Sequence, residues 1–208
     1  MKKIISIAAI SAALLLTGCS QVSSAASVGS FKISQSTVQS SIDSIMAERE
    51  KFDTSAMPLA YGEELNRSQM RFHILTELLS EAAAKLKITV SKAEIDTRRA
   101  NIIEQIGGEE ELPNALVVAG IAPLDFDLYL QGVILSDKIA QGLVATGVTE
   151  DQIGASIQKL VIDMAAEKKI TINPRYGAWD AATADVVPVD SAGSAVTPSN
   201  ESLHLLMV

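Results

Sequence analysis

Apolar residues recur every three or four positions along most of the chain, a spacing typical of helices that bury one face. The pattern predicts six helices. They begin near Ser34 or Ser36, Tyr61, Ser91, Glu109, Pro123 and Thr149, and they end near Phe52, Lys87, Gly107, Ala119, Gly147 and the residues before Ile170, respectively. We therefore expect a mainly α fold.

The second predicted helix has the broadest apolar stripe. Its members are Leu65, Phe72, Leu75, Leu78, Leu79, Ala82, Ala83 and Leu86. Such a stripe must be buried against other helices or serve as a binding surface. Two later helices begin with a predicted capping box, Ser91 to Glu94 and Thr149 to Gln152, whose side chains satisfy free backbone N–H groups.

Two short runs, Phe31-Lys32-Ile33 and Ile170-Thr171-Ile172, have the alternation and the β-branched residues of strands. They flank the helices in sequence. Our hypothesis is that these two strands pair and so bring the ends of the domain together.

The N-terminus has the three-part layout of a secretory signal. Lys2 and Lys3 precede an apolar run over 4–16, which leads into Leu16-Thr17-Gly18-Cys19. These four residues resemble the lipobox of bacterial lipoproteins, so we predict a signal peptide over 1–18 and lipidation of Cys19. Two alternatives remain: a membrane-spanning helix, which takes about 20 apolar residues, and secretion with an unmodified cysteine.

Composition divides the remainder of the chain into three parts. Residues 19–30 are rich in Ser, Ala and Gly and are predicted to be a flexible tether. Residues 31–180 form the predicted helical domain. Residues 181–208 contain no Lys or Arg and are predicted to be a disordered, low-complexity tail, although its end, Leu203 to Val208, is strongly apolar.

The formal net charge of −8 becomes more negative once Lys2 and Lys3 are removed with the signal peptide. An acidic chain argues against nucleic acid as a partner and against electrostatic binding to anionic lipid. Cys19 is the one cysteine, so the chain has no internal disulfide. The composition leaves the oligomeric state open.

The order of these elements resembles the SurA N-terminal domain family, an extracytoplasmic chaperone domain also found in PrsA- and PpiD-type foldases. The resemblance covers 28–180 and depends on three segments. They are AKLKITVSKAEID at Ala84–Asp96, GIAPLDF at Gly120–Phe126 and INPRYGAWD at Ile172–Asp180. The family often has a small turn residue where Leu86 and Lys87 stand, and Ser in place of Ala122.

Many relatives carry a parvulin prolyl isomerase domain before the closing segment, which takes roughly a further hundred residues. Here only one predicted helix lies between Gly147 and Lys169. The chain has two histidines, His73 and His204, whereas a parvulin site uses buried histidines and polar partners. We therefore expect no prolyl isomerase activity.

Flexible and aromatic apolar side chains are the candidate contacts for a bound polypeptide. The candidates are Met46, Met57, Met70, Phe72, Phe126 and Tyr129. Filling of the core is the alternative role for each of them, and Trp179 is expected to anchor the closing segment. Asp125 and Asp127 do not form a metal pair, because positions two apart on a helix point in different directions.

No motif supplies a nucleophile with an adjacent base, a metal-ligand cluster or a phosphate loop. We thus expect a non-enzyme that uses no cofactor. The resemblance implies a membrane-anchored extracytoplasmic chaperone or foldase accessory lipoprotein that binds unfolded or nascent exported polypeptides without ATP. The alternative is a non-catalytic envelope scaffold lipoprotein that binds one specific partner.

Overall fold

The structure, a computed structural model, describes residues 24–189. The elements in chain order are β1 (Ser24–Val28), β2 (Phe31–Ser34), α1 (Gln35–Arg49), α2 (Gly62–Lys85), α3 (Lys92–Ile106), η1 (Glu109–Glu111), α4 (Leu112–Ala119), η2 (Pro123–Asp125), α5 (Phe126–Ala145), α6 (Glu150–Lys168), β3 (Ile170–Ile172), η3 (Pro174–Tyr176), β4 (Ala178–Asp180) and β5 (Asp185–Val187). The predictions of a mainly α fold and of six helices are confirmed within this range. The fourth and fifth helices each follow a 3-10 turn, η1 and η2.

The predicted pairing of Phe31–Ile33 with Ile170–Ile172 is wrong. Both runs are strands, but β1 lies between them in an antiparallel sheet of order β2-β1-β3. Ala26 of β1 faces Ile33 on one side and Ile172 on the other. The two ends of the helical region therefore meet through a third strand, which forms a hairpin with β2.

The tether predicted over 19–30 is also wrong from Ser24 onward, because Ser24–Val28 is the central strand of this sheet. Ala25, Ala26 and Val28 are buried in the hydrophobic core that includes α2. A run of Ser and Ala has the composition of a linker. Here it is a strand because it hydrogen-bonds to β2 on one side and to β3 on the other.

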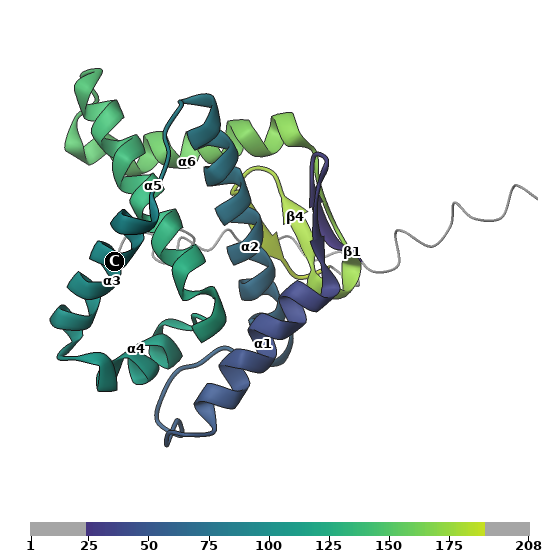
Figure 1. Ribbon diagram of the computed structural model, residues 1–208. Helices are drawn as coiled ribbons and strands as arrows, with labels where there is room; N and C mark the ends of the chain where they lie inside the picture. The colour runs from purple at the N-terminus through teal and green to yellow at the C-terminus, as the bar shows by residue number, and fades with distance from the viewer. Residues whose placement is uncertain (1–23, 190–208) are drawn as a thin grey trace, which may run out of the picture.

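The predicted tail begins too early as well, since β4 and β5 form a hairpin that packs on α2 (Figure 1). Ala184 and Val186 are buried in the core, and Trp179 pairs with Val186 and packs against the same core, as its predicted anchoring role requires. Gly177, at φ +117°, precedes this hairpin; a Cβ there would lie 2.5 Å from the carbonyl oxygen of Val187. The predictions for 1–23 and 190–208 lie outside the described residues.

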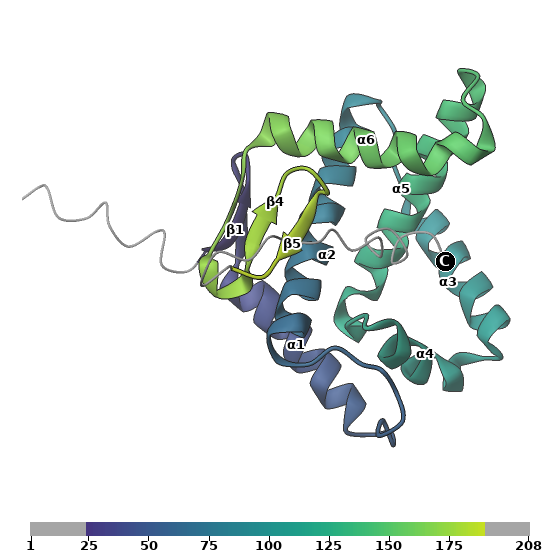
Figure 2. The same cartoon turned by 180° about the vertical axis from the view of Figure 1, so that it is seen from behind.

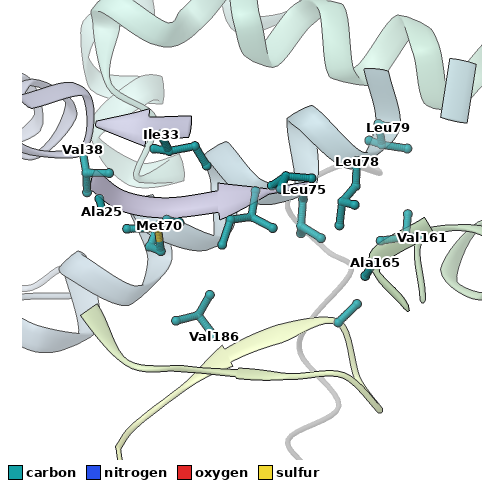
Figure 3. Packing of buried hydrophobic residues seen from close by; sticks show 14 of the residues in the cluster. Ala25, Ile33, Val38, Met70, Leu75, Leu78, Leu79, Val161, Ala165 and Val186 are labelled. Carbon is teal, nitrogen blue, oxygen red and sulfur yellow. The ribbon is translucent and has the colours of Figure 1, made fainter. Parts of the chain in front are cut away.

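The larger of two hydrophobic clusters surrounds α2, which lies at the centre of the domain. Figure 3 shows side chains from both hairpins, α1 and α6 directed toward this helix. The residues that α2 contributes to this cluster include Met70, Ile74, Leu78 and Leu79, all of them almost completely buried. The apolar stripe predicted for the second helix is thus largely used to form this core.

A second, smaller cluster lies where α4 and α5 meet α2. Its buried members are Leu116, Ile121, Phe126, Tyr129, Leu130 and Val133. Four partly buried residues pack against it: Phe72, Ile95, Ile102 and Leu112. Figure 2 shows α3 at the outer edge of the molecule, where it covers this cluster from one side.

One predicted capping box forms and the other does not. Ser91 accepts a hydrogen bond from the Glu94 amide, and the Glu94 carboxylate accepts one from the Ser91 amide at 2.9 Å. Thr149 occupies the N-cap of α6, but its side chain makes no capping bond. The amide of Gln152 donates to the Thr149 carbonyl oxygen instead, at 2.9 Å.

Between residues 24 and 189, each helix taken alone is too short or too polar to cross a membrane. The segments Glu109–Ala119 and Pro123–Ala145 meet the length and composition criterion together, with a bend of 102° between them.

Candidate functional site

A pocket of about 150 Å³ opens between the loop that follows α1, the first half of α2 and the end of α4. Its lining consists of Arg49, Pro58, Leu59, Ala60, Leu65, Ser68, Gln69, Phe72, Val118, Ala119, Gly120, Ile121 and Ala122. We call it the Arg49 pocket. An apolar cavity of this size holds a benzene-sized group, so the pocket has room for one apolar side chain.

Arg49, the last residue of α1, is the one charged residue in this lining, and it is 5% exposed. Its Nη1 donates to the Ala60 carbonyl oxygen at 2.7 Å, and its guanidinium lies 4.9 Å from the centre of the Tyr61 ring. Nε is buried and has no hydrogen-bond partner among the described residues. Burial lowers the pKa of Arg49 because it removes water from the charged form.

The far wall of the Arg49 pocket is held in place by a side chain of α2. Gln69 is buried, and its Nε2 donates to the Gly120 carbonyl oxygen at 3.0 Å. This bond satisfies a carbonyl group at the C-terminal end of α4, where helix carbonyls lack partners within the helix. The last turn of α4 is thereby fixed against α2.

Three exposed apolar or aromatic residues lie in the pocket lining or next to Arg49. Met46 is 38% exposed, Tyr61 is 49% exposed and Val118 is 60% exposed. Met46 Sδ lies 4.0 Å from Arg49 Nη1, so it borders the same group from the helix side. The loop after α1 and the helix α4 lie at the same end of the molecule (Figure 1).

Helix α3 borders the second cluster without burying any of its own residues. Ile95, Ile102, Ile103 and Ile106 are each only partly covered, and we call these four residues the α3 face. Phe72 lines the Arg49 pocket and packs against the second cluster, which also contacts Ile95 and Ile102. The pocket and helix α3 therefore border the same buried cluster from different sides.

Charged side chains attach α3 to α5. Arg98 pairs with Asp137, and Arg99 pairs with Asp127. Glu94 pairs with Lys138 at 2.5 Å. The hydrogen bond from Lys138, together with those from Ser91, lowers the pKa of Glu94 to about 2.

The match to known families covers residues 1–106 and is to the SurA-like N-terminal domain. These residues are half of the chain and include β1, β2, α1, α2 and α3. The chain belongs to the SurA-like N-terminal domain family. No curated protein and no solved structure matches it. In this SurA-like domain, the α1 and α2 residues of the Arg49 pocket lie within the matched part, whereas Val118 to Ala122 lie beyond it.

Three predicted contact residues of the SurA-like domain lie at or next to the Arg49 pocket. Met46 lies at its rim, and Phe72 is in its lining. Met57 is partly exposed in the loop after α1 and directly precedes Pro58, another lining residue. The structure thus brings together residues that are far apart in sequence.

The other three predicted contact residues are not available to a bound polypeptide. Met70 is 0% exposed and belongs to the core around α2. Phe126 and Tyr129 are buried in the second cluster, where their rings stack with centroids 6.4 Å apart. For these residues the alternative role, core filling, is the one the structure shows, because they lie on the inward faces of α2 and α5. Cys19 lies outside the described residues.

A buried polar network connects α1, α2 and η2. Ser41 Oγ lies 2.9 Å from His73 Nε2 and donates to Asp125 Oδ2 at 2.5 Å. Because the hydroxyl has one proton, His73 Nε2–H is the donor toward Ser41. Burial lowers the pKa of His73, and the nearby Asp125 carboxylate opposes this shift.

This network differs from a catalytic triad, in which the histidine lies between the nucleophile and the carboxylate. Here Ser41 lies between His73 and Asp125, and it is completely buried. Among residues 24–189, no group of three His, Cys, Asp or Glu side chains is arranged to hold a metal ion.

Sequence reasoning missed both Arg49 and the Ser41–His73–Asp125 network. An arginine at the end of a helix has the ordinary pattern of a dipole-stabilising residue, and nothing local shows that it is buried. Ser41 falls within the apolar stripe of α1 between Val38 and Ile42. A polar residue in an otherwise apolar stripe was the feature of the sequence that could have indicated a buried hydrogen-bond network.

Proposed function

We propose that the protein is a membrane-anchored extracytoplasmic chaperone or foldase accessory lipoprotein that binds unfolded exported polypeptides without ATP. Membership of the SurA-like family supports a relation to chaperone-like foldases. The observation that carries the proposal is the pairing of the Arg49 pocket with the α3 face. Both leave apolar side chains only partly covered.

The partly covered side chains provide a driving force for binding. Complete burial of one exposed isoleucine side chain contributes roughly 1.5–3 kcal/mol of favourable free energy. A polypeptide that covers the α3 face would obtain part of this free energy from each of its four isoleucines. Binding by burial of apolar area needs no nucleotide.

Lipidation of Cys19 would hold this surface at a membrane. Because a tethered domain meets its ligands at a raised effective concentration, weak contacts with individual segments would be sufficient. The proposal therefore includes membrane attachment on the extracytoplasmic side.

The test is suppression of aggregation of a chemically denatured client by the mature chain without ATP. Val118→Ser should weaken it several-fold, because the change removes roughly 1–2 kcal/mol of apolar contact at the pocket rim. Val144→Ser is the matched control, since Val144 is 48% exposed and does not line the pocket. Circular dichroism should show that both variants are folded.

Several unrelated clients should be tested. If stoichiometric amounts of the wild-type chain leave aggregation of all of them unchanged, the chaperone proposal is wrong. One stoichiometric partner in crosslinking, with no binding of denatured clients, would favour the scaffold alternative. We propose no catalysed reaction, and a proline-peptide isomerisation assay should remain at background.

A further inference from the structure

We propose that the Arg49 pocket binds the C-terminal residue of a polypeptide whose last side chain is apolar and whose terminal carboxylate is free. This inference rests on the proposed function, since it names the part of an unfolded client that the pocket takes. It depends on two features that occur together in the pocket: an unneutralised buried cation and a cavity the size of one side chain.

The cation calls for an anionic partner. Arg49 is 5% exposed, no acidic residue lines the pocket, and no ion pair within residues 24–189 involves Arg49. A buried charge without an opposite charge is costly, so a ligand that supplies one is favoured. The contacts that Arg49 does make, with the Ala60 carbonyl oxygen and the Tyr61 ring, hold the guanidinium in place without neutralising it.

The geometry of the guanidinium favours a carboxylate. Arginine presents its N–H groups in a planar fork that matches the two oxygens of a carboxylate. Nη1 is used by Ala60, whereas Nε–H has no partner and provides an edge for a carboxylate oxygen. Because Nε is covered, the residues around it must shift slightly when a carboxylate binds.

The cavity selects the rest of the ligand. Its volume of about 150 Å³ and its lining by Leu65, Phe72 and Ile121 suit a leucine or phenylalanine side chain. Within a polypeptide, only the last residue joins an apolar side chain and a carboxylate at one Cα. An internal apolar residue brings a neutral peptide group, and an internal Asp or Glu brings no apolar group. The pocket chemistry therefore distinguishes a chain end from an internal segment.

The experiment compares two fluorescein-labelled peptides of one sequence ending in Leu-Phe, one with a free C-terminal carboxylate and one with a C-terminal amide. The protein is the mature chain carrying Cys19→Ser, which changes none of the described residues. Fluorescence anisotropy should give at least tenfold tighter binding for the free acid. In Arg49→Gln this ratio should fall to near one, because the variant has no cation to pair with the free carboxylate.

A second variant covers the case in which Arg49→Gln does not fold. Val118→Glu places a carboxylate at the exposed rim of the pocket and should weaken binding of the acid peptide more than that of the amide peptide. Val144→Glu, away from the pocket, is its control and should change neither affinity.

The outcomes separate this inference from the proposed function. Equal binding of acid and amide peptides by the wild-type chain overturns the inference, whereas suppression of aggregation in the same preparation leaves the chaperone proposal intact. An acid preference that survives in both Arg49→Gln and Val118→Glu also overturns it, because the carboxylate is then recognised elsewhere. If the wild-type chain binds neither peptide and does not reduce the aggregation of denatured clients, both proposals are wrong.

Discussion

Buried polar side chains determine how α1, α2 and the following turns fit together. Ser41, His73 and Asp125 satisfy one another between three elements, and Gln69 ties α2 to the end of α4. Buried polar groups are costly unless they are hydrogen-bonded, so these contacts favour one packing of the helices over others. Arg49 differs from the rest because one of its buried donors has no partner.

The His73 network makes stability depend on pH. Burial holds the pKa of His73 below its ordinary value of 6.5 in the folded chain, whereas the unfolded chain has the ordinary value. Below pH 6.5 the unfolded state therefore binds more protons, and the free energy of unfolding should fall as the pH is lowered from about 6.5 toward the folded pKa. Urea denaturation of the wild-type chain between pH 7.5 and 5 measures this slope.

The control for this prediction is His73→Gln, whose amide does not titrate and can still donate to Ser41. Carboxylates away from His73 have the same surroundings in both proteins, so their contribution cancels in the comparison, whereas the interaction of His73 with Asp125 is part of the measured difference. The variant should lose less stability than the wild type over this pH range. If the free energy of unfolding depends on pH in the same way in both proteins, His73 does not take up a proton on unfolding in this pH range.

Helix α3 differs from the other long helices because charges rather than buried side chains attach it. Its ion pairs with α5 are largely exposed, and exposed pairs each contribute only about 0–1 kcal/mol. The α3 face adds partial apolar contact with the second cluster. We therefore expect α3 to open more easily than α2, which would enlarge the surface available to a client.

The Glu94 pKa of about 2 leads to a test on this element. A carboxylate whose folded pKa lies below its ordinary value of 4.5 stabilises the folded state above that value and loses this effect as the pH falls toward 2. At neutral pH, Glu94→Gln removes the charge that pairs with Lys138. Amide hydrogen exchange over Lys92–Ile106 should then be several-fold faster than in the wild type.

Glu104→Gln is the matched control, since Glu104 is an exposed glutamate on the same helix. It should leave exchange in α3 unchanged. Exchange in α2 should be the same in all three proteins, because its protection depends on the larger core. Equal exchange of α3 in the wild type and Glu94→Gln would show that the Lys138 pair contributes nothing measurable.

The whole molecule has a closed half and a more open half. Strands from both ends of the described chain close the cluster around α2, whereas the second cluster is bordered by the incompletely buried α3. Figure 1 and Figure 2 both show the sheet containing β1 and the helix α3 on opposite sides. A membrane anchor preceding β1 would therefore lie on the side of the domain opposite helix α3.

The anchor itself can be tested in the intact chain. In a bacterial host fed labelled palmitate, the wild-type protein should incorporate label and Cys19→Ser should not, because the thiol is the proposed site of acylation. Ser20→Ala is the control and should be labelled like the wild type. Label that persists in Cys19→Ser, or its absence from the wild type, would contradict lipidation at Cys19.

Local patterns were sufficient for the helices and for the strands β2 and β3, but insufficient for β1, β4 and β5 and for how the strands pair. The helical spacing, the Ser91–Glu94 box and the glycines that end helices are effects within one or two turns, so the sequence alone predicted six helices. The small residues of β1 and the short strand β5 (Asp185–Val187) have no such local signal. They became strands because β2, β3 and β4 supply partners and α2 supplies a surface to cover.

The same division applies to the candidate site. From the sequence alone came the family resemblance and the apolar and methionine-bearing helical faces from which the site is built. Tertiary structure decided which of those side chains are buried, as with Met70, and which lie at a pocket, as with Met46 and Phe72. It alone revealed that Arg49 is buried without a full set of partners, because burial and pairing depend on residues far apart in the chain.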